Sequence, residues 1–219
     1  MKKIEIQGFT IVELMIATAI FSTILLICTT AMIQVGRYYY KGVNSARTQE
    51  SARNIIEQIS LPVQLSGYEP YPIPFNTNNY NGLDVYAFCI GNDRYNFAID
   101  VQVTDGLPDS TYNPARQSPH ALWKDKTTDP SCPTADLTLN KPSSDAATGK
   151  ELLNSGMRIK ALSVAPVVGN PSLWSVDVSL LYGDSDLIDP ATGNCISSSI
   201  GGSFCGVSDL HTTVYRRVQ

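Results

Sequence analysis

The chain lacks the short motifs that mark the commonest nucleotide-binding, metal-dependent and redox enzymes. None of the patterns GxxxxGK[ST], GxGxxG, HExxH or CxxC occurs in its 219 residues. The nearest approach to a hydrolase nucleophile elbow is GGSFC at residues 201–205, which has cysteine where the second glycine must stand. Only two histidines are present, His120 and His211, and they leave little room for a multi-histidine metal site. We therefore expect no enzyme activity and no cofactor.

Charge is also scarce, and its sign does not suit nucleic acid. Charged residues make up 16% of the chain, against about 25% in typical proteins. The net charge of −4 and the pI near 5.1 argue against binding to phosphate backbones, which needs a basic surface. We expect no sequence-specific nucleic acid partner. With 43% hydrophobic residues, the chain can instead bury a core.

A long apolar run without proline occupies residues 9–36, and Glu13 is its only charge. The 25 residues from 11 to 35 would form about 37 Å of helix at about 1.5 Å per residue. Because a bilayer core is about 30 Å thick, a helix of this length can span it with some tilt. The run therefore predicts a single transmembrane helix.

Three other interpretations of this N-terminus remain open at this point. A secretory signal would be cut after Ala31, but its apolar core would be long and would contain Glu13. A lipoprotein signal would use Cys28, although Ile27 stands where a small residue is needed. A plain single-span anchor leaves Glu13 unexplained. Cys28 itself lies within the apolar run, where we expect it to be a packing residue.

Glu13 is the informative residue of the run. A carboxylate at this depth costs about 2.5–3.5 kcal/mol on insertion scales, so we expect it to have a partner or a function. A short polar leader with two lysines, residues 1–7, precedes Gly8, and the sequence GFTIVEL at residues 8–14 joins the leader to the apolar run. Glycine, phenylalanine and glutamate therefore stand at fixed spacing where the apolar helix begins.

This segment closely resembles the prepilin cleavage site of type IV pilins and type II secretion pseudopilins, over residues 1 to about 36. The resemblance implies that prepilin peptidase cuts after Gly8 on the cytoplasmic face and that Phe9 becomes the N-methylated N-terminus. It also implies that Glu13 pairs with a free N-terminal ammonium as subunits pack into a filament, because both charges gain from pairing in apolar surroundings. Glu5 departs from the family pattern, since such leaders are usually basic.

The resemblance also divides the chain into segments. It implies a leader at residues 1–8, a transmembrane and assembly helix at 9–36, and an extracytoplasmic head at 62–219. Between them, residues 37–61 would continue the helix in amphipathic form, and we expect Pro62 to stop it. The apolar residues that share one face at helical spacing are Ala52, Ile55, Ile56 and Ile59.

The head is expected to be rich in β-strand. Segments with strand-like patterns are residues 83–90, 94–103, 157–164, 173–182 and 212–217. Gly91, Asn92 and Asp93 join the first two as a hairpin, and residues 157–164 and 173–182 form a second pair. Residues 104–156 form a long proline-rich loop, with short strands expected near 121–123 and 136–139. The economical architecture is an α+β fold, in which one antiparallel sheet of four to six strands packs on the end of the long helix.

Four cysteines lie outside the apolar run, where an extracytoplasmic location would let disulfides form and persist. Four cysteines allow three connectivities. Cys195 and Cys205 bracket a loop rich in serine and glycine, which favours a local bridge, and Cys89 would then pair with Cys132. Buried free thiols remain the alternative.

Asp184, Asp186 and Asp189 lie along a short acidic loop. Such carboxylates can hold Ca²⁺, but the loop lacks the glycine and the distal glutamate of an EF-hand. We favour a solvated acidic turn over a calcium site, and expect no metal.

The C-terminal strands loosely resemble those of PilW-like minor pilins and J-type minor pseudopilins, in residues 157–164, 174–183 and 211–217. The resemblance implies a minor subunit of a type IV pilus or pseudopilus that serves adhesion, motility, DNA uptake or secretion. Its partners would be prepilin peptidase and other pilin subunits, major and minor. It would be single-pass in the inner (cytoplasmic) membrane before assembly and extracellular, in the pilus or pseudopilus, afterwards. The alternative is a single-span, membrane-anchored extracytoplasmic adhesin or enzyme.

Overall fold

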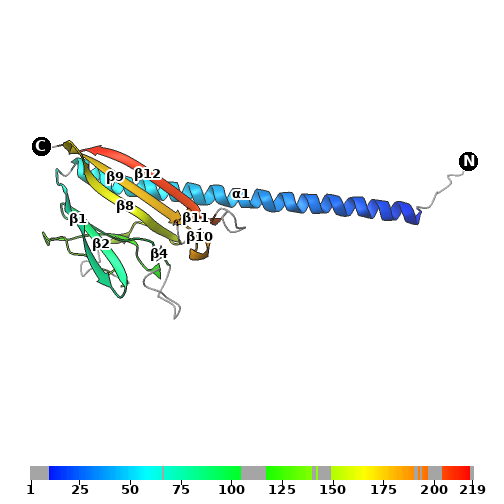
Figure 1. Ribbon diagram of the computed structural model, residues 1–219, viewed down its shortest axis with the longest axis horizontal. Coiled ribbons are helices and arrows are strands. Elements are labelled where there is room, and N and C mark those ends of the chain that lie inside the picture. Colours follow the sequence, from blue (N-terminus) through cyan, green and yellow to red (C-terminus); the bar gives the residue numbers. More distant parts are fainter. Residues whose placement is uncertain are drawn as a thin grey trace, which may run out of the picture. The chain divides into compact units, whose positions relative to one another are not determined.

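The computed structural model has one long helix followed by an antiparallel β-rich head, which confirms the expected α+β class (Figure 1). It describes residues 10–65, 67–104, 117–139, 142, 149–189, 192, 194–196 and 204–217. The chain divides into two compact units, Met1–Tyr40 and Lys41–Gln219. From here on, the head means the second unit, which includes the last part of α1 as well as the strands. The described elements are α1 (Ile11–Leu65), β1 (Pro70–Tyr80), β2 (Leu83–Ile90), β3 (Asp93–Ala98), β4 (Gln102–Val103), β5 (Gln117–Ser118), β6 (Leu122–Lys126), β7 (Lys150–Glu151), β8 (Met157–Val167), β9 (Asn170–Tyr182), the 3₁₀ turn η2 (Ser185–Leu187), β10 (Ile188–Asp189), β11 (Asn194–Cys195) and β12 (Gly206–Tyr215).

The part of α1 that belongs to the head buries one face. Ala52, Ile55 and Ile59 are at most 1% exposed and join the main core, as their spacing predicts, and Val63, beyond the expected end of the helix, joins them. Ile56 packs against the same core while partly buried. The apolar stripe therefore holds this stretch of helix against the head.

The expectation that Pro62 ends the helix is wrong, because α1 continues to Leu65. Proline lacks a backbone N–H, so the carbonyl oxygen of Gln58 loses the donor that an ordinary residue four positions later would supply. Tyr95 replaces it: its hydroxyl donates to the Gln58 oxygen at 2.7 Å. Burial first, and Asp93 second, raise the pKa of the Tyr95 hydroxyl, which therefore stays protonated as a donor.

The strands form two main sheets instead of the one sheet that we expected. The first has the order β1-β2-β3-β6-β7 and the second β12-β9-β8, both antiparallel. In the head, the second sheet lies along α1 (Figure 1). One core cluster contains residues from α1 and from both sheets, and a smaller cluster lies around Val85, Trp123 and Leu137. The hairpin β8–β9 buries Trp174, Val176, Val178 and Leu180, the alternation that the sequence predicts.

The expected single strand at 94–103 is wrong, because the chain changes sheet there. β3 ends at Ala98, and Asp100 adopts a left-handed φ of 58°, which aspartate tolerates better than most residues. The Asp100 amide donates to the carbonyl of Ile159 in β8 at 2.8 Å, and Ile99 forms a parallel bridge to Ile159. One residue in a left-handed conformation thus connects the two sheets.

Strand β1 was not expected from the sequence, because prolines 70, 72 and 74 argue against a strand. It lies at the edge of the first sheet, where a missing backbone N–H is tolerated. Asn81 and Gly82, with φ of 52° and 89°, form the tight turn into β2. An Asn-Gly pair between strands is the strongest short-range hairpin pattern, and it was the signal that we overlooked.

Two other expectations in the head need correction. β6 confirms a strand near residues 121–123, but residues 136–139 form a turn, because the Asp136 carboxylate accepts bonds from the Thr138 amide at 2.9 Å and hydroxyl at 2.6 Å. The last strand, β12, begins at Gly206 and not at Thr212. β5 and β7 were also not anticipated.

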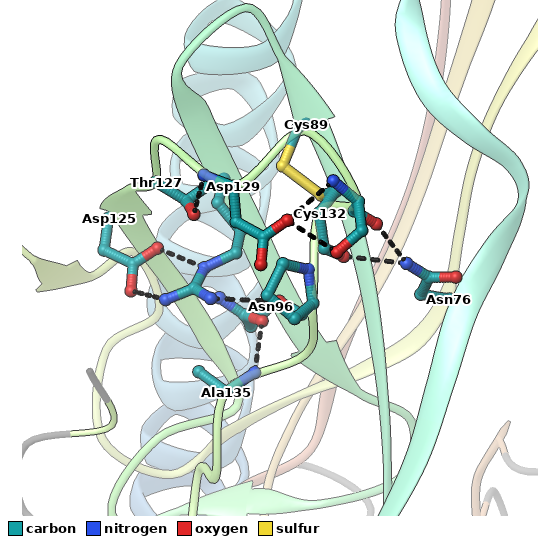
Figure 2. The surroundings of a disulfide bond; sticks show 11 residues. Asn76, Cys89, Asn96, Asp125, Thr127, Asp129, Cys132 and Ala135 are labelled. Carbon is teal, nitrogen blue, oxygen red and sulfur yellow. Dashed lines mark hydrogen bonds and ion pairs between the residues drawn. A yellow bond between two sulfur atoms is a disulfide. The ribbon is translucent and has the colours of Figure 1, made fainter. Parts of the chain in front are cut away.

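Residues 127–139 form a loop that a disulfide ties to the first sheet. Figure 2 shows the bond between Cys89 of β2 and Cys132, with the Asn76 side chain beside it. The Asn76 amide donates to the carbonyl oxygens of Ser131 and Cys132 at 2.7 and 2.8 Å. A bridge across a sequence separation of 43 contributes about 4 kcal/mol by restricting the unfolded chain.

A buried ion pair holds the other side of this loop. The Arg94 guanidinium donates to both carboxylate oxygens of Asp125, at 2.8 and 2.6 Å, and to the carbonyl of Pro133 at 3.0 Å (Figure 2). The amide oxygen of Asn96 accepts from the Ala135 amide at 2.8 Å. Removal of one member of a buried pair costs about 3–5 kcal/mol, because it leaves the other charge buried and unpaired, so this loop requires both Arg94 and Asp125.

The bond between Tyr95 and Gln58 gives a test of the proline account. Tyr95→Phe is expected to lower the free energy of unfolding of the head by about 1–2 kcal/mol, because it leaves the part-buried carbonyl of Gln58 without this donor. In a Pro62→Ala background the same substitution should cost less, since the alanine supplies the missing helical N–H. Urea unfolding of the full chain in detergent measures all four proteins. Tyr86→Phe is the matched control, and an equal Tyr95→Phe cost in both backgrounds would contradict the account.

Candidate functional site

The candidate site lies at the N-terminal end of α1. The described chain begins here at Thr10, so the expected cleavage positions, Gly8 and Phe9, lie outside the described residues. Helix α1 starts at Ile11, and Glu13 occupies its first turn. Positive partial charge gathers at the N-terminus of a helix, which is a favourable place for a carboxylate.

Thr10 and Glu13 form a reciprocal pair of caps. The Thr10 amide and hydroxyl donate to Glu13 Oε2 at 3.0 and 2.9 Å, and the Glu13 amide donates to Thr10 Oγ1 at 3.3 Å. This is the capping box of the pattern S/T-x-x-E/Q, which satisfies two backbone donors that the helix leaves unbonded. We did not anticipate it, although residues 10–13 spell the pattern.

The capping box changes the interpretation of Glu13. The carboxylate has partners within its own chain, so it does not enter the apolar run without hydrogen bonds. Both donors from Thr10 reach Oε2, and a carboxylate offers about four lone-pair positions. Among the described residues, Oε1 takes no hydrogen bond, so Glu13 can accept a further donor without losing the cap.

The apolar run that follows Glu13 is exposed in the single chain. The side chains of residues 11–35 are all exposed. Of the part of the chain that the structure describes, α1 is the one helix long and apolar enough to cross a membrane. The free cysteine of the described chain, Cys28, is exposed in this run, so the described residues do not bury it.

The four cysteines of the head form two pairs at disulfide distance. Cys89 bonds to Cys132 and Cys195 bonds to Cys205. The second bond ties β11 to the residue that precedes β12, next to the helix. There the Asn44 amide of α1 donates to the carbonyl of Phe204 at 3.1 Å. Both bonds therefore brace the head.

The three aspartates of the acidic loop, Asp184, Asp186 and Asp189, do not converge on one point. Asp184 accepts a bond from the Gln102 amide at 3.2 Å, and Asp189 accepts one from the Thr192 hydroxyl at 2.9 Å. Asp186 is exposed. Within the described ranges, no group of three or more His, Cys, Asp or Glu side chains is placed to hold a metal ion.

A serine, a histidine and an aspartate meet on the exposed face of the second sheet. Ser175 donates to one oxygen of Asp177 at 2.9 Å, and His211 Nδ1 contacts the other oxygen. The hydrogen bond from His211, and to a lesser degree that from Ser175, lowers the pKa of Asp177. In a catalytic triad the carboxylate bonds one ring nitrogen of the histidine and the serine hydroxyl bonds the other. Here Asp177 contacts Nδ1, but the atom that lies 3.5 Å from His211 Nε2 is the Thr213 hydroxyl oxygen. The cluster therefore does not activate Ser175 as a nucleophile.

Comparison with known proteins identifies the N-terminal segment. The family model for the prokaryotic N-terminal methylation motif matches residues 6–29. The matched residues contain Gly8, Phe9 and Glu13 and extend into the apolar part of α1. No curated protein and no solved structure matches the chain. The motif supports a precursor of the pilin or pseudopilin type, which is a structural and not a catalytic class of protein.

The capping box can be tested without reference to assembly. Thr10→Val removes the hydroxyl but keeps the shape of the side chain, and should cost the helix end about 1 kcal/mol, so that exchange of the Glu13 amide speeds up about fivefold. Hydrogen exchange of the full chain in detergent micelles measures this. Thr10→Ser keeps the hydroxyl and should retain protection. Wild-type protection in the valine variant would show that the cap is absent.

Proposed function

We propose that this chain is a structural subunit, and a minor one, of a type IV pilus or pseudopilus. One observation carries the proposal: the methylation motif at residues 6–29 coincides with the start of an exposed apolar run of α1 whose single charge is Glu13. A soluble helix would bury its apolar face in its own fold. A helix exposed on every side requires lipid first and other subunits later.

Processing would create the group that Glu13 requires. Prepilin peptidase would hydrolyse the peptide bond between Gly8 and Phe9, releasing the leader with a new carboxylate and leaving an α-ammonium on Phe9. An α-amino group has an unperturbed pKa of about 8, so this nitrogen is mostly protonated at neutral pH. N-methylation leaves a secondary amine that is still protonated at neutral pH, so the positive charge is retained. The mature chain therefore starts with a cation close to the capping box.

Assembly would then pair this cation with a carboxylate. In the single subunit, Thr10 keeps Glu13 hydrogen-bonded, which reduces the cost of holding a carboxylate at the membrane. In the filament, the N-terminal ammonium of a neighbouring subunit would bind the remaining oxygen. The ammonium can hydrogen-bond the carboxylate only at contact distance, so the pairing would fix the register between neighbouring helices.

Assignment as a minor subunit rests on two features. The C-terminal strands resemble those of PilW-like minor pilins, and removal of eight residues from 219 leaves 211, more than the usual major pilin. The head, with its two disulfides, would lie outside the cytoplasm, first at the inner membrane and then on the filament. A membrane-anchored adhesin or enzyme that keeps its whole N-terminus is the competing function.

Processing distinguishes the two functions. Gly8→Val should block cleavage, because the peptidase must approach the backbone closely and a branched side chain obstructs it. Immunoblots of membranes should then show uncut precursor, whereas Gly36→Val, far from the cut, should be processed as wild type. Normal processing of the Gly8 variant would contradict the prepilin function.

Two substitutions of Glu13 separate the role of its charge in assembly from its role in capping the helix. Glu13→Gln retains an oxygen for the capping box but has no charge, whereas Glu13→Leu loses both. Both variants should be inserted and cleaved, and both should enter filaments poorly, while only the leucine variant loses protection of the helix end. The measurement is the amount of this chain in sheared filaments relative to membranes. Wild-type incorporation of the glutamine variant would show that pairing with an ammonium has no role.

A further inference from the structure

Three consecutive tyrosines follow the apolar run on α1. Tyr38, Tyr39 and Tyr40 are 76%, 68% and 52% exposed. The rings of Tyr39 and Tyr40 meet edge to face, with centroids 6.0 Å apart. Three large, exposed aromatic side chains in a row are unusual on a helix that faces only water. Their position directly after the apolar run suggests which surroundings they suit.

The spacing of the tyrosines indicates surroundings that extend around more than half of the helix. Successive residues of an α-helix point about 100° apart, so three in a row cover about 200° of its circumference. A stripe that packs on a partner helix would instead repeat every three or four residues. Tyr38, Tyr39 and Tyr40 therefore fit a flat layer around the helix better than a groove on one side of it.

The distance from the start of the helix indicates which layer this is. Tyr39 stands 28 residue steps after Ile11, or about 42 Å along α1 at about 1.5 Å per residue. A bilayer with its headgroup regions is about 40–45 Å thick. A tyrosine ring prefers the apolar side of a headgroup layer, and its hydroxyl prefers the wet side. Arg37, next to the tyrosines, can reach lipid phosphates.

We propose that Tyr38, Tyr39 and Tyr40 form a belt in the lipid headgroup layer on the head side of the bilayer, where it sets the depth of α1 before assembly. The belt fixes depth and leaves the helix free to rotate about its axis, because its rings point in several directions. The proposal rests on the membrane anchoring in the proposed function and adds the depth at which the chain is held.

The test uses the full chain in vesicles of phosphatidylethanolamine and phosphatidylglycerol whose acyl chains carry bromine, a short-range quencher of tryptophan. One lipid set carries bromine near the headgroup and the other near the chain end. Tyr39→Trp reports on the belt, Ile20→Trp on the middle of the run and Gln49→Trp on the head. Trp123 and Trp174, which are 6% and 3% exposed in the head, give a background that the wild type measures.

The belt predicts that shallow bromine quenches Tyr39→Trp about twofold more than deep bromine, with the order reversed for Ile20→Trp and little quenching of Gln49→Trp. Replacement of all three tyrosines by serine should shift the depth of Ile20→Trp. Absent or deep quenching at position 39, with normal quenching at position 20, would overturn the belt alone. Absent quenching at position 20 would overturn the membrane anchoring as well.

Discussion

The carboxylate of Glu13, the single charge of the apolar run at residues 9–36, is the constraint on which the proposed function depends. Thr10 donates hydrogen bonds to this carboxylate within the chain, so a subunit inserted in a membrane would not carry a carboxylate without hydrogen bonds. The same arrangement leaves an oxygen for a second donor, which cleavage of a neighbouring chain would supply. A residue that is costly for an isolated anchor would thus become useful in the assembly that we propose.

The head depends on a second constraint, its attachment to α1. Apolar side chains hold one end of the shared interface, from Ala52 to Val63, while small and polar residues hold the other. A Cβ on Gly206 would lie 3.0 Å from Thr48 Oγ1 and 3.1 Å from the carbonyl oxygen of Asn44, so the strand approaches the helix closely there. The Cys195–Cys205 disulfide braces the chain just before this contact.

Elements that local sequence patterns determine could be predicted, whereas features that depend on contacts between residues far apart in the chain could not. The apolar run shows in composition, while the buried stripe of α1 and the β8–β9 alternation are periodic, and all three were predicted from the sequence. Pro62 was misjudged because Tyr95, which replaces its missing donor, comes from another element. The division into two sheets depends on Asp100 and its bond to Ile159, which no local pattern shows. The capping box at Thr10 and the Asn81–Gly82 turn were local signals that we overlooked.

The central claim is that cleavage after Gly8 converts a membrane precursor into a filament subunit. The most direct test is the mass of the N-terminal peptide of this chain, recovered from sheared filaments. The account predicts a peptide that begins at Phe9 and carries one N-methyl group. A peptide that begins at Met1, or at Met32 after removal of most of the apolar run, would contradict it.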